Sequence, residues 1–144
     1  KMKARQGSKM VKIALVVSDF NKEITSKMEK NAGKLAGSLD VKIVKKIHVP
    51  GAFEIPFAAQ TLMKQRNIDA VVVLGAVIQG DTDHDVVIVN SVSKKLLDLS
   101  IQYNKPIGFG IIGPRVTWQQ AEERAVEYSE RAVKAVLEMA KIRK

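Results

Sequence analysis

Apolar residues along the chain fall into two alternating kinds of segment. Four short runs are rich in valine and isoleucine, as is typical of strands in a parallel sheet that is buried on both faces. Four longer segments have apolar residues three or four positions apart, which predicts amphipathic helices. The expected strands cover residues 11–17, 41–49, 69–78 and 105–112, and the expected helices cover 22–39, 52–66, 86–103 and 117–144.

This alternation of strands and helices predicts one α/β domain over residues 11–144. Strands that are joined through helices pair in parallel with right-handed crossovers, so helices cover both faces of the sheet. We therefore expect a three-layer α/β/α sandwich around a four-stranded parallel sheet. Thr117 begins the last expected helix and is a suitable N-cap residue.

The positive charge of the chain is concentrated at its ends. Of the total charge of +9, residues 1–10 contribute +4, residues 141–144 contribute +3 and the rest of the chain contributes +2. Aromatic residues make up 5% of the sequence, which leaves little material for stacking on bases. We therefore do not expect nucleic-acid binding. We exclude residues 1–10 from the fold prediction as a disordered or appended basic segment.

The chain has no cysteine, which excludes disulfides, zinc–thiolate sites, iron–sulfur clusters and cysteine nucleophiles. No apolar run approaches the ~20 residues that a membrane-spanning helix needs. Residues 1–10 also lack the apolar centre of a secretory signal. We therefore expect a cytoplasmic protein with no membrane partner.

Short polar segments follow the expected strands. They are SDFN (18–21), VPGAFE (49–54) and IQGDTDHD (78–85), and the fourth strand leads into GFGIIGPR (108–115). In parallel α/β sheets, ligands bind beyond the carboxyl ends of the strands. The sequence therefore predicts one small-molecule site at this edge.

The segment GDTDHD at residues 80–85 has several interpretations. It begins a helix, where free backbone N–H groups favour an anion such as phosphate. Capping of that helix by a side chain of residues 81–83 would explain the same residues without any function. Its three aspartates lack the glycine and distal glutamate of a calcium loop, so we expect no metal. His84 is a candidate general acid or base, because imidazole titrates near neutral pH.

Other residues near the predicted edge also allow two interpretations. Phe20 and Asn21 would suit a planar ring that is stacked and hydrogen-bonded, or they are a buried phenylalanine and a helix-capping asparagine. Glu54 either accepts hydrogen bonds from hydroxyls or is simply favourable near a helix start. Arg124 is explained locally by an ion pair with a glutamate on its own helix.

In their order and spacing, these segments resemble the 6,7-dimethyl-8-ribityllumazine synthase family. The matching text is SDFN, VPGAFEIP, VVLGAVIQGDTDHD, NKPIGFGI and QAEERA, and it spans nearly the whole chain from residue 11. GDTDHD and EYSERAVKAV look most like archaeal members. The resemblance implies a flavodoxin-like fold and the condensation of 5-amino-6-ribitylaminouracil with 3,4-dihydroxy-2-butanone 4-phosphate. It implies release of phosphate and water with no cofactor. It also implies homo-oligomers built from pentamers, which in some members form decamers or sixty-subunit shells.

The resemblance also assigns roles to individual residues. His84 would transfer protons, Phe20 would stack on the pyrimidine with Asn21 beside it, and Glu54 would accept hydrogen bonds from the ribityl chain. The other implied contacts are Ala52 and Phe53 with the ribityl chain, backbone groups of Ala76, Val77 and Ile78 with the pyrimidine, backbone N–H groups of Asp81 and Thr82 with the phosphate, Phe109 from a neighbouring subunit over the ring, and Arg124 with the phosphate.

The sequence departs from the bacterial pattern of this family at two places. Gln79 stands where bacterial members often have arginine, so one positive charge near the phosphate is absent. The bacterial GNKG segment is replaced by EYSERA, so its lysine is not carried over, and Arg131 is a candidate replacement.

Two alternative functions stay open on this sequence. An archaeal-type riboflavin synthase shares the fold and uses the lumazine product, although SDFN and His84 favour lumazine synthase. An assembly scaffold derived from the family would keep the fold without needing the catalytic residues. The presence of Phe20, Glu54, His84 and Arg124 favours an enzyme.

Overall fold

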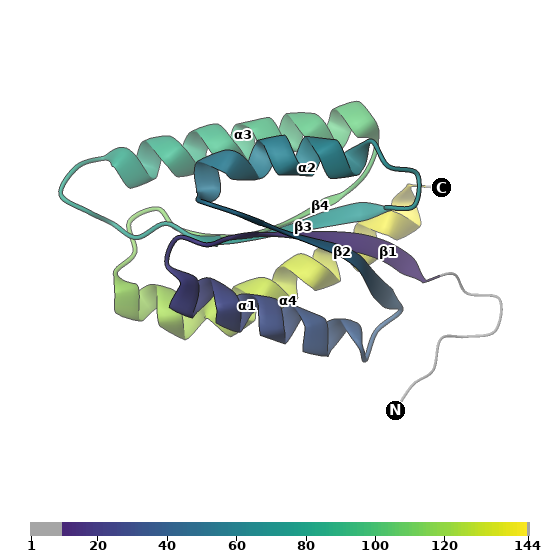
Figure 1. The fold of residues 1–144 in the computed structure, drawn as a ribbon, viewed down its shortest axis with the longest axis horizontal. Helices are drawn as coiled ribbons and strands as arrows, with labels where there is room; N and C mark the ends of the chain where they lie inside the picture. The colour runs from purple at the N-terminus through teal and green to yellow at the C-terminus, as the bar shows by residue number, and fades with distance from the viewer. Residues whose placement is uncertain (1–9, 144) are drawn as a thin grey trace.

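The computed structural model describes residues 10–143, which form an α/β sandwich (Figure 1). The elements are β1 (Val11–Ser18), α1 (Lys22–Ala36), β2 (Val41–Val49), the short 3-10 helix η1 (Ala52–Glu54), α2 (Ile55–Met63), β3 (Ala70–Ala76), α3 (His84–Tyr103), β4 (Ile107–Ile112) and α4 (Trp118–Ile142). Residues 1–10 were expected to be a disordered or appended basic segment. All of these residues except Met10 lie outside the described part of the chain.

The four strands form one parallel sheet in the order β2-β1-β3-β4. This is the start of the flavodoxin-like order 2-1-3-4-5. Helices α1 and α4 cover one face of the sheet, and α2 and α3 cover the other (Figure 1). The predicted three-layer arrangement with a four-stranded parallel sheet is confirmed.

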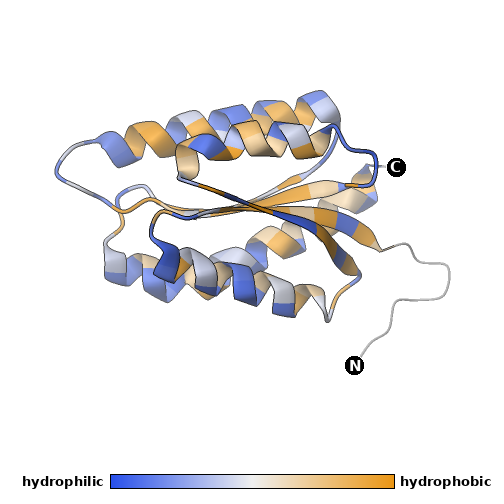
Figure 2. Ribbon diagram, in the orientation of Figure 1, coloured by the Kyte–Doolittle hydropathy of each residue, from blue (hydrophilic) through white to orange (hydrophobic). Residues whose placement is uncertain are grey.

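The sheet separates two apolar clusters. Ile13, Leu15 and Val17 of β1 belong to the cluster under α1 and α4, whereas Ala14 and Val16 belong to the cluster under α2 and α3. Figure 2 shows hydrophobic residues along the central strands, while hydrophobic and polar residues alternate along the helices. This pattern explains why continuous apolar runs formed strands: each of their residues has a buried face to fill.

Several element boundaries differ from those expected. The predicted helix over residues 52–66 is divided into η1 and the shorter α2. Helix α1 ends at Ala36 rather than at residue 39, because Gly37 and Ser38 are weak helix formers. Strand β4 begins at Ile107, directly after Pro106, which has no N–H group for the ladder. The N-cap role of Thr117 is confirmed, since its side chain accepts a hydrogen bond from the backbone N–H of Gln120.

Charged side chains connect the end of α4 to the opposite, amino-terminal edge of the sheet. The Arg143 guanidinium lies 3.7 Å from a carboxylate oxygen of Asp69, and its Nε donates to the carbonyl oxygen of Asn104 at 2.7 Å. Lys105 Nζ donates to the carbonyl oxygen of Gln65 at 2.7 Å. Burial of the Lys105 ammonium, followed by the charge of Arg143, lowers the pKa of Lys105, and Asp69 partly opposes this.

This shift in the pKa of Lys105 predicts how its contribution to stability depends on pH. The pKa of Lys105 in the folded protein lies below its ordinary value of 10.5. At a pH between these two pKa values, the unfolded chain therefore binds more protons than the folded chain. The free energy of unfolding of the wild type, relative to Lys105→Met, should therefore rise as the pH increases toward 10.5. Denaturant unfolding of both proteins at a series of pH values measures this difference. A difference that stays constant or falls would contradict the prediction.

Candidate active site

Backbone hydrogen bonds hold the first two polar segments side by side at the carboxyl edge of the sheet. The N–H of Asp19 donates to the carbonyl oxygen of Val49 at 2.7 Å, and the N–H of Phe20 donates to that of Pro50 at 3.0 Å. The segment SDFN therefore lies against the start of VPGAFE, as the parallel sheet predicted.

Asn21 joins this pair to the end of β3. It occupies the N-cap position of α1 in the left-handed conformation, with φ 63°, and makes no side-chain capping bond. Its Nδ2 instead donates to the carbonyl oxygen of Ala76 at 2.7 Å. The alternative of a capping asparagine is therefore wrong. The alternative of a buried phenylalanine is also wrong, because Phe20 is 71% exposed.

The segment after β2 presents a second aromatic ring and a carboxylate at the same edge. Ala52 is buried and anchors η1, whereas Phe53 is 66% exposed and Glu54 is also exposed. A Cβ atom built on Gly51 would lie 3.3 Å from Oε1 of Glu54, so the carboxylate lies close against the Gly51 backbone. This edge therefore carries exposed rings beside an acceptor suited to hydroxyl groups.

The end of β3 and the residues after it are hydrogen-bonded to the segments that follow β1 and β4. Ala76 receives the Asn21 amide, and the N–H of Val77 donates to the carbonyl oxygen of Ile112 at 2.8 Å. Val77 and Ile78 are half-buried beyond the end of β3. Their apolar character extended the predicted strand to residue 78, but β3 ends at Ala76.

Residues 80–83 form an exposed turn that leads into α3. Oγ1 of Thr82 accepts a hydrogen bond from the N–H of His84 at 3.2 Å, so Thr82 partly satisfies the start of the helix. Asp83 is the N-cap residue but makes no side-chain capping bond. His84 is the first residue of α3 and is exposed, which is compatible with proton exchange with a bound molecule.

The carboxylate of Asp85 has a different environment from those of Asp81 and Asp83. Asp85 is 3% exposed, and its Oδ2 accepts a hydrogen bond from the backbone N–H of Arg115 at 2.8 Å. Asp81 and Asp83 are exposed. The alternation of aspartates in the sequence gave no sign that only one of them would be buried, and the pairing with Arg115 was not predicted.

Phe109 lies at the outer edge of the sheet rather than among these residues. It is 40% exposed and lines a hollow of about 490 Å³ between β4 and α4, together with Tyr128 and Arg131. The guanidinium of Arg131 lies 5.4 Å from the centre of the Tyr128 ring and 3.7 Å from the carboxylate of Glu127.

Arg124 is exposed on α4, on the face of the sheet opposite α3 (Figure 1). Within residues 10–143, its expected ion pair with a helical glutamate is absent: Glu127 pairs with Arg131, and Glu123 accepts a hydrogen bond from Gln119. The local explanation for Arg124 is therefore wrong. The described chain thus separates the predicted site residues into one group at the carboxyl edge and a second group on β4 and α4.

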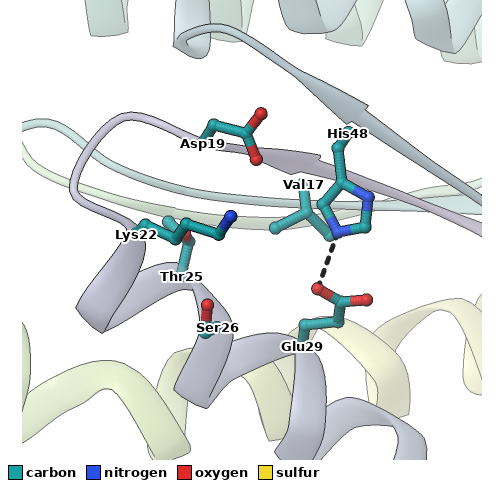
Figure 3. A pocket seen from close by; sticks show the side chains of 7 residues that line it. All are labelled: Val17, Asp19, Lys22, Thr25, Ser26, Glu29 and His48. Carbon is teal, nitrogen blue, oxygen red and sulfur yellow. Dashed lines mark hydrogen bonds and ion pairs between the residues drawn. The ribbon is translucent and has the colours of Figure 1, made fainter.

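A separate hollow of about 300 Å³ opens on the α1 side of the sheet (Figure 3). There Nε2 of His48 lies 2.8 Å from Oε1 of Glu29, and Lys46 lies 3.7 Å from the other carboxylate oxygen. Within the described part of the chain, no group of three or more His, Asp or Glu side chains is placed to hold a metal ion. None of the helices within residues 10–143 combines the length and the apolar character that a membrane-spanning helix needs.

The fold and the grouping of polar residues at its carboxyl edge define a flavodoxin-like α/β protein with a candidate small-molecule site between strand ends. The sequence profile of the 6,7-dimethyl-8-ribityllumazine synthase family matches residues 10–144. The chain belongs to this family.

Similar archaeal proteins cover most of the chain and carry the name 6,7-dimethyl-8-ribityllumazine synthase. The protein of Methanococcus vannielii is 45% identical over 132 residues, which are 92% of this chain and 94% of the relative. That of Staphylothermus marinus is 48% identical over 130 residues, or 90% of this chain and 87% of the relative. That of Methanopyrus kandleri is 46% identical over 129 residues, or 90% and 91%.

Proposed function

We propose that this protein catalyses the condensation of 5-amino-6-ribitylaminouracil with 3,4-dihydroxy-2-butanone 4-phosphate in riboflavin biosynthesis. The observation that carries the proposal is the position of His84. It begins α3 at the same sheet edge as the exposed ring of Phe20 and the carboxylate of Glu54. Membership of the lumazine synthase family supports it. Because phosphorylated intermediates do not cross membranes unaided, the proposed compartment is the cytoplasm.

In this proposal, each part of the edge holds one part of the substrates. Phe20 stacks on the pyrimidine, and Asn21 fixes the end of β3 beside it through its bond to Ala76. Glu54 accepts hydrogen bonds from ribityl hydroxyls, with Ala52 and Phe53 beside it. Backbone groups of Ala76, Val77 and Ile78 would contact the pyrimidine edge, and the N–H groups of Asp81 and Thr82 would face the phosphate.

The condensation requires several proton transfers to and from the bound substrates. The 5-amino nitrogen attacks the ketone carbon, and loss of water forms an imine. A proton is then lost from the carbon next to the imine, and phosphate leaves from the following carbon, which gives an enol. The enol tautomerises to a ketone, and the ribitylamino nitrogen attacks this carbonyl carbon and closes the second ring with loss of a second water. His84 is the group proposed to give and take these protons, because it is an imidazole at the edge where the substrates would meet.

We also propose that a neighbouring subunit completes the site. Phe109 and Arg124 are exposed on β4 and α4, away from His84, so a second copy of the chain would have to bring them to it. This arrangement is proposed for a homo-oligomer built from pentamers, and the assembly would then be part of the mechanism.

The function is tested by supplying the two substrates to the purified protein. The expected result is the absorbance and fluorescence of a lumazine, together with a particle mass that is a multiple of five 15.9 kDa chains. Conversion of purified lumazine to riboflavin would instead assign riboflavin synthase activity. Full turnover by a 15.9 kDa monomer would contradict the shared site.

Replacing Arg124 with alanine should mainly weaken use of the phosphorylated substrate. A charge-assisted hydrogen bond contributes about 1.5–3 kcal/mol, so the KM for the butanone phosphate should rise roughly 10- to 100-fold. Steady-state kinetics with each substrate varied in turn measures this. Arg66→Ala, which removes another exposed arginine, is the control. An effect confined to the pyrimidine substrate would contradict the assignment.

A further inference from the structure

Asp85 carries the one charged side chain that is buried within residues 10–143. A buried carboxylate is costly unless it is hydrogen-bonded. Its partner is the backbone N–H of Arg115, at 2.8 Å, in the turn between β4 and α4. The proposed reaction uses neither residue, so this buried charge needs an explanation.

The turn between β4 and α4 is hydrogen-bonded to both ends of segment 79–85, which leads into α3. The N–H of Gln79 donates to the carbonyl oxygen of Val116 at 2.8 Å, and Asp85 receives the N–H of Arg115. Residues 115–116 are therefore held directly beside residues 79 and 85. Arg115 is the one positively charged residue among the hydrogen-bond partners of residues 79–85 in the described chain.

Arg115 also has an uncommon backbone conformation. Its φ is 64°, in the left-handed region that non-glycine residues other than Asn and Asp seldom adopt. Its side chain is exposed. Glycine would take this conformation without strain, so local geometry does not explain why an arginine stands there.

We propose that Arg115 binds the phosphate of the substrate at the start of α3 of its own subunit, and that Asp85 is its positioning residue. This inference rests on the proposed function. The segment 79–85 has the neutral Gln79 and three aspartates, so it has no positive side chain of its own to offset the charge of a phosphate. Arg124, the other cation proposed for the phosphate, would come from a neighbouring subunit. Arg115 supplies a positive charge from the same subunit, and its guanidinium matches the geometry of phosphate oxygens.

Arg115→Gly tests this assignment without backbone strain, because glycine accepts φ 64°. We expect the inhibition constant for inorganic phosphate and the KM for the butanone phosphate both to rise roughly 10-fold or more. The KM for the pyrimidine substrate should stay unchanged, and Arg115→Lys should restore part of the loss. Arg66→Ala, the control, should change none of these constants.

The positioning role of Asp85 is tested by substitutions at Asp85, alone and together with Arg115→Gly. Asp85→Ala should raise the same two constants, whereas Asp85→Asn keeps an acceptor for the Arg115 N–H and should have a smaller effect. In the Arg115→Gly background, Asp85→Ala should add little to either constant if it acts through Arg115. Asp83→Asn, on the same turn but exposed, is the matched control. Additive effects of the two substitutions would overturn the positioning role.

The failure of this inference and the failure of the proposed function give different results. If the wild type makes lumazine and Arg115→Gly leaves both phosphate constants unchanged, the Arg115 assignment is wrong and the function stands. If the wild type makes no lumazine, the stabilisation of the folded protein by inorganic phosphate is compared by thermal unfolding. Loss of that stabilisation in Arg115→Gly supports the phosphate contact, and its retention overturns it.

Discussion

Replacing His84 with alanine is expected to lower the rate of the condensation by roughly 10- to 10³-fold, because the substrates lose the proposed group for general acid–base catalysis. The overall fold should be retained. His84 is exposed, and the hydrogen bond at this position comes from its backbone N–H to Thr82, which alanine preserves. Turnover of saturating substrates, measured from lumazine absorbance, gives the rate. Particle mass shows whether the assembly is intact.

The second histidine provides the control for this experiment. His48 lies near the carboxyl end of β2, in the hollow beside α1, where it is bound to Glu29 (Figure 3). This hollow is on the face of the sheet opposite α3, the helix that His84 begins (Figure 1). His48→Ala should leave turnover near that of the wild type. If His84→Ala also turns over at the wild-type rate while its particle mass is unchanged, His84 has a structural role and the proposed proton transfer is wrong.

The fold was predictable because its signal is repeated along the whole chain. The run at residues 70–76 is fully buried in β3, and its unbroken apolar character requires helices on both faces of the sheet. The ends of the helices and strands were less predictable, since each depends on one or two residues. Pro106 delays β4 because it has no N–H, while Val77 and Ile78 look like strand residues but leave the sheet.

The candidate site was predictable only where sequence position fixed spatial position. The ends of parallel strands meet at one edge, so SDFN, VPGAFE and GDTDHD were placed together correctly. Local reasoning failed at Asn21, because the acceptor of its amide is Ala76, 55 positions away. It failed at Asp85 for the same reason, since Arg115 is 30 positions away. Nothing in the spacing of the aspartates distinguishes a buried carboxylate from an exposed one.

Replacing Gly108 with alanine should destabilise the protein by about 1–3 kcal/mol, the usual cost of forcing an extra group into a packed core. A Cβ atom at this position would meet the carbonyl oxygen of Ala132 and, at 2.9 Å, its carbonyl carbon. These are backbone atoms of α4, so no side-chain rotation relieves the overlap, and the helix has to move away from β4. The midpoint of urea unfolding measures the loss.

Gly33→Ala is the matched control, because it adds the same methyl group where no atom beyond the adjoining backbone of α1 lies within 4 Å. Gly33 lies inside α1, so alanine should stabilise the protein by roughly 0.5–1 kcal/mol. Equal unfolding midpoints for the two variants would contradict the packing account. Ala132 also lines the hollow that contains Phe109 and Arg131. A displaced α4 would therefore alter the surface proposed to complete a neighbour's site, and Gly108→Ala should lose assembly together with stability.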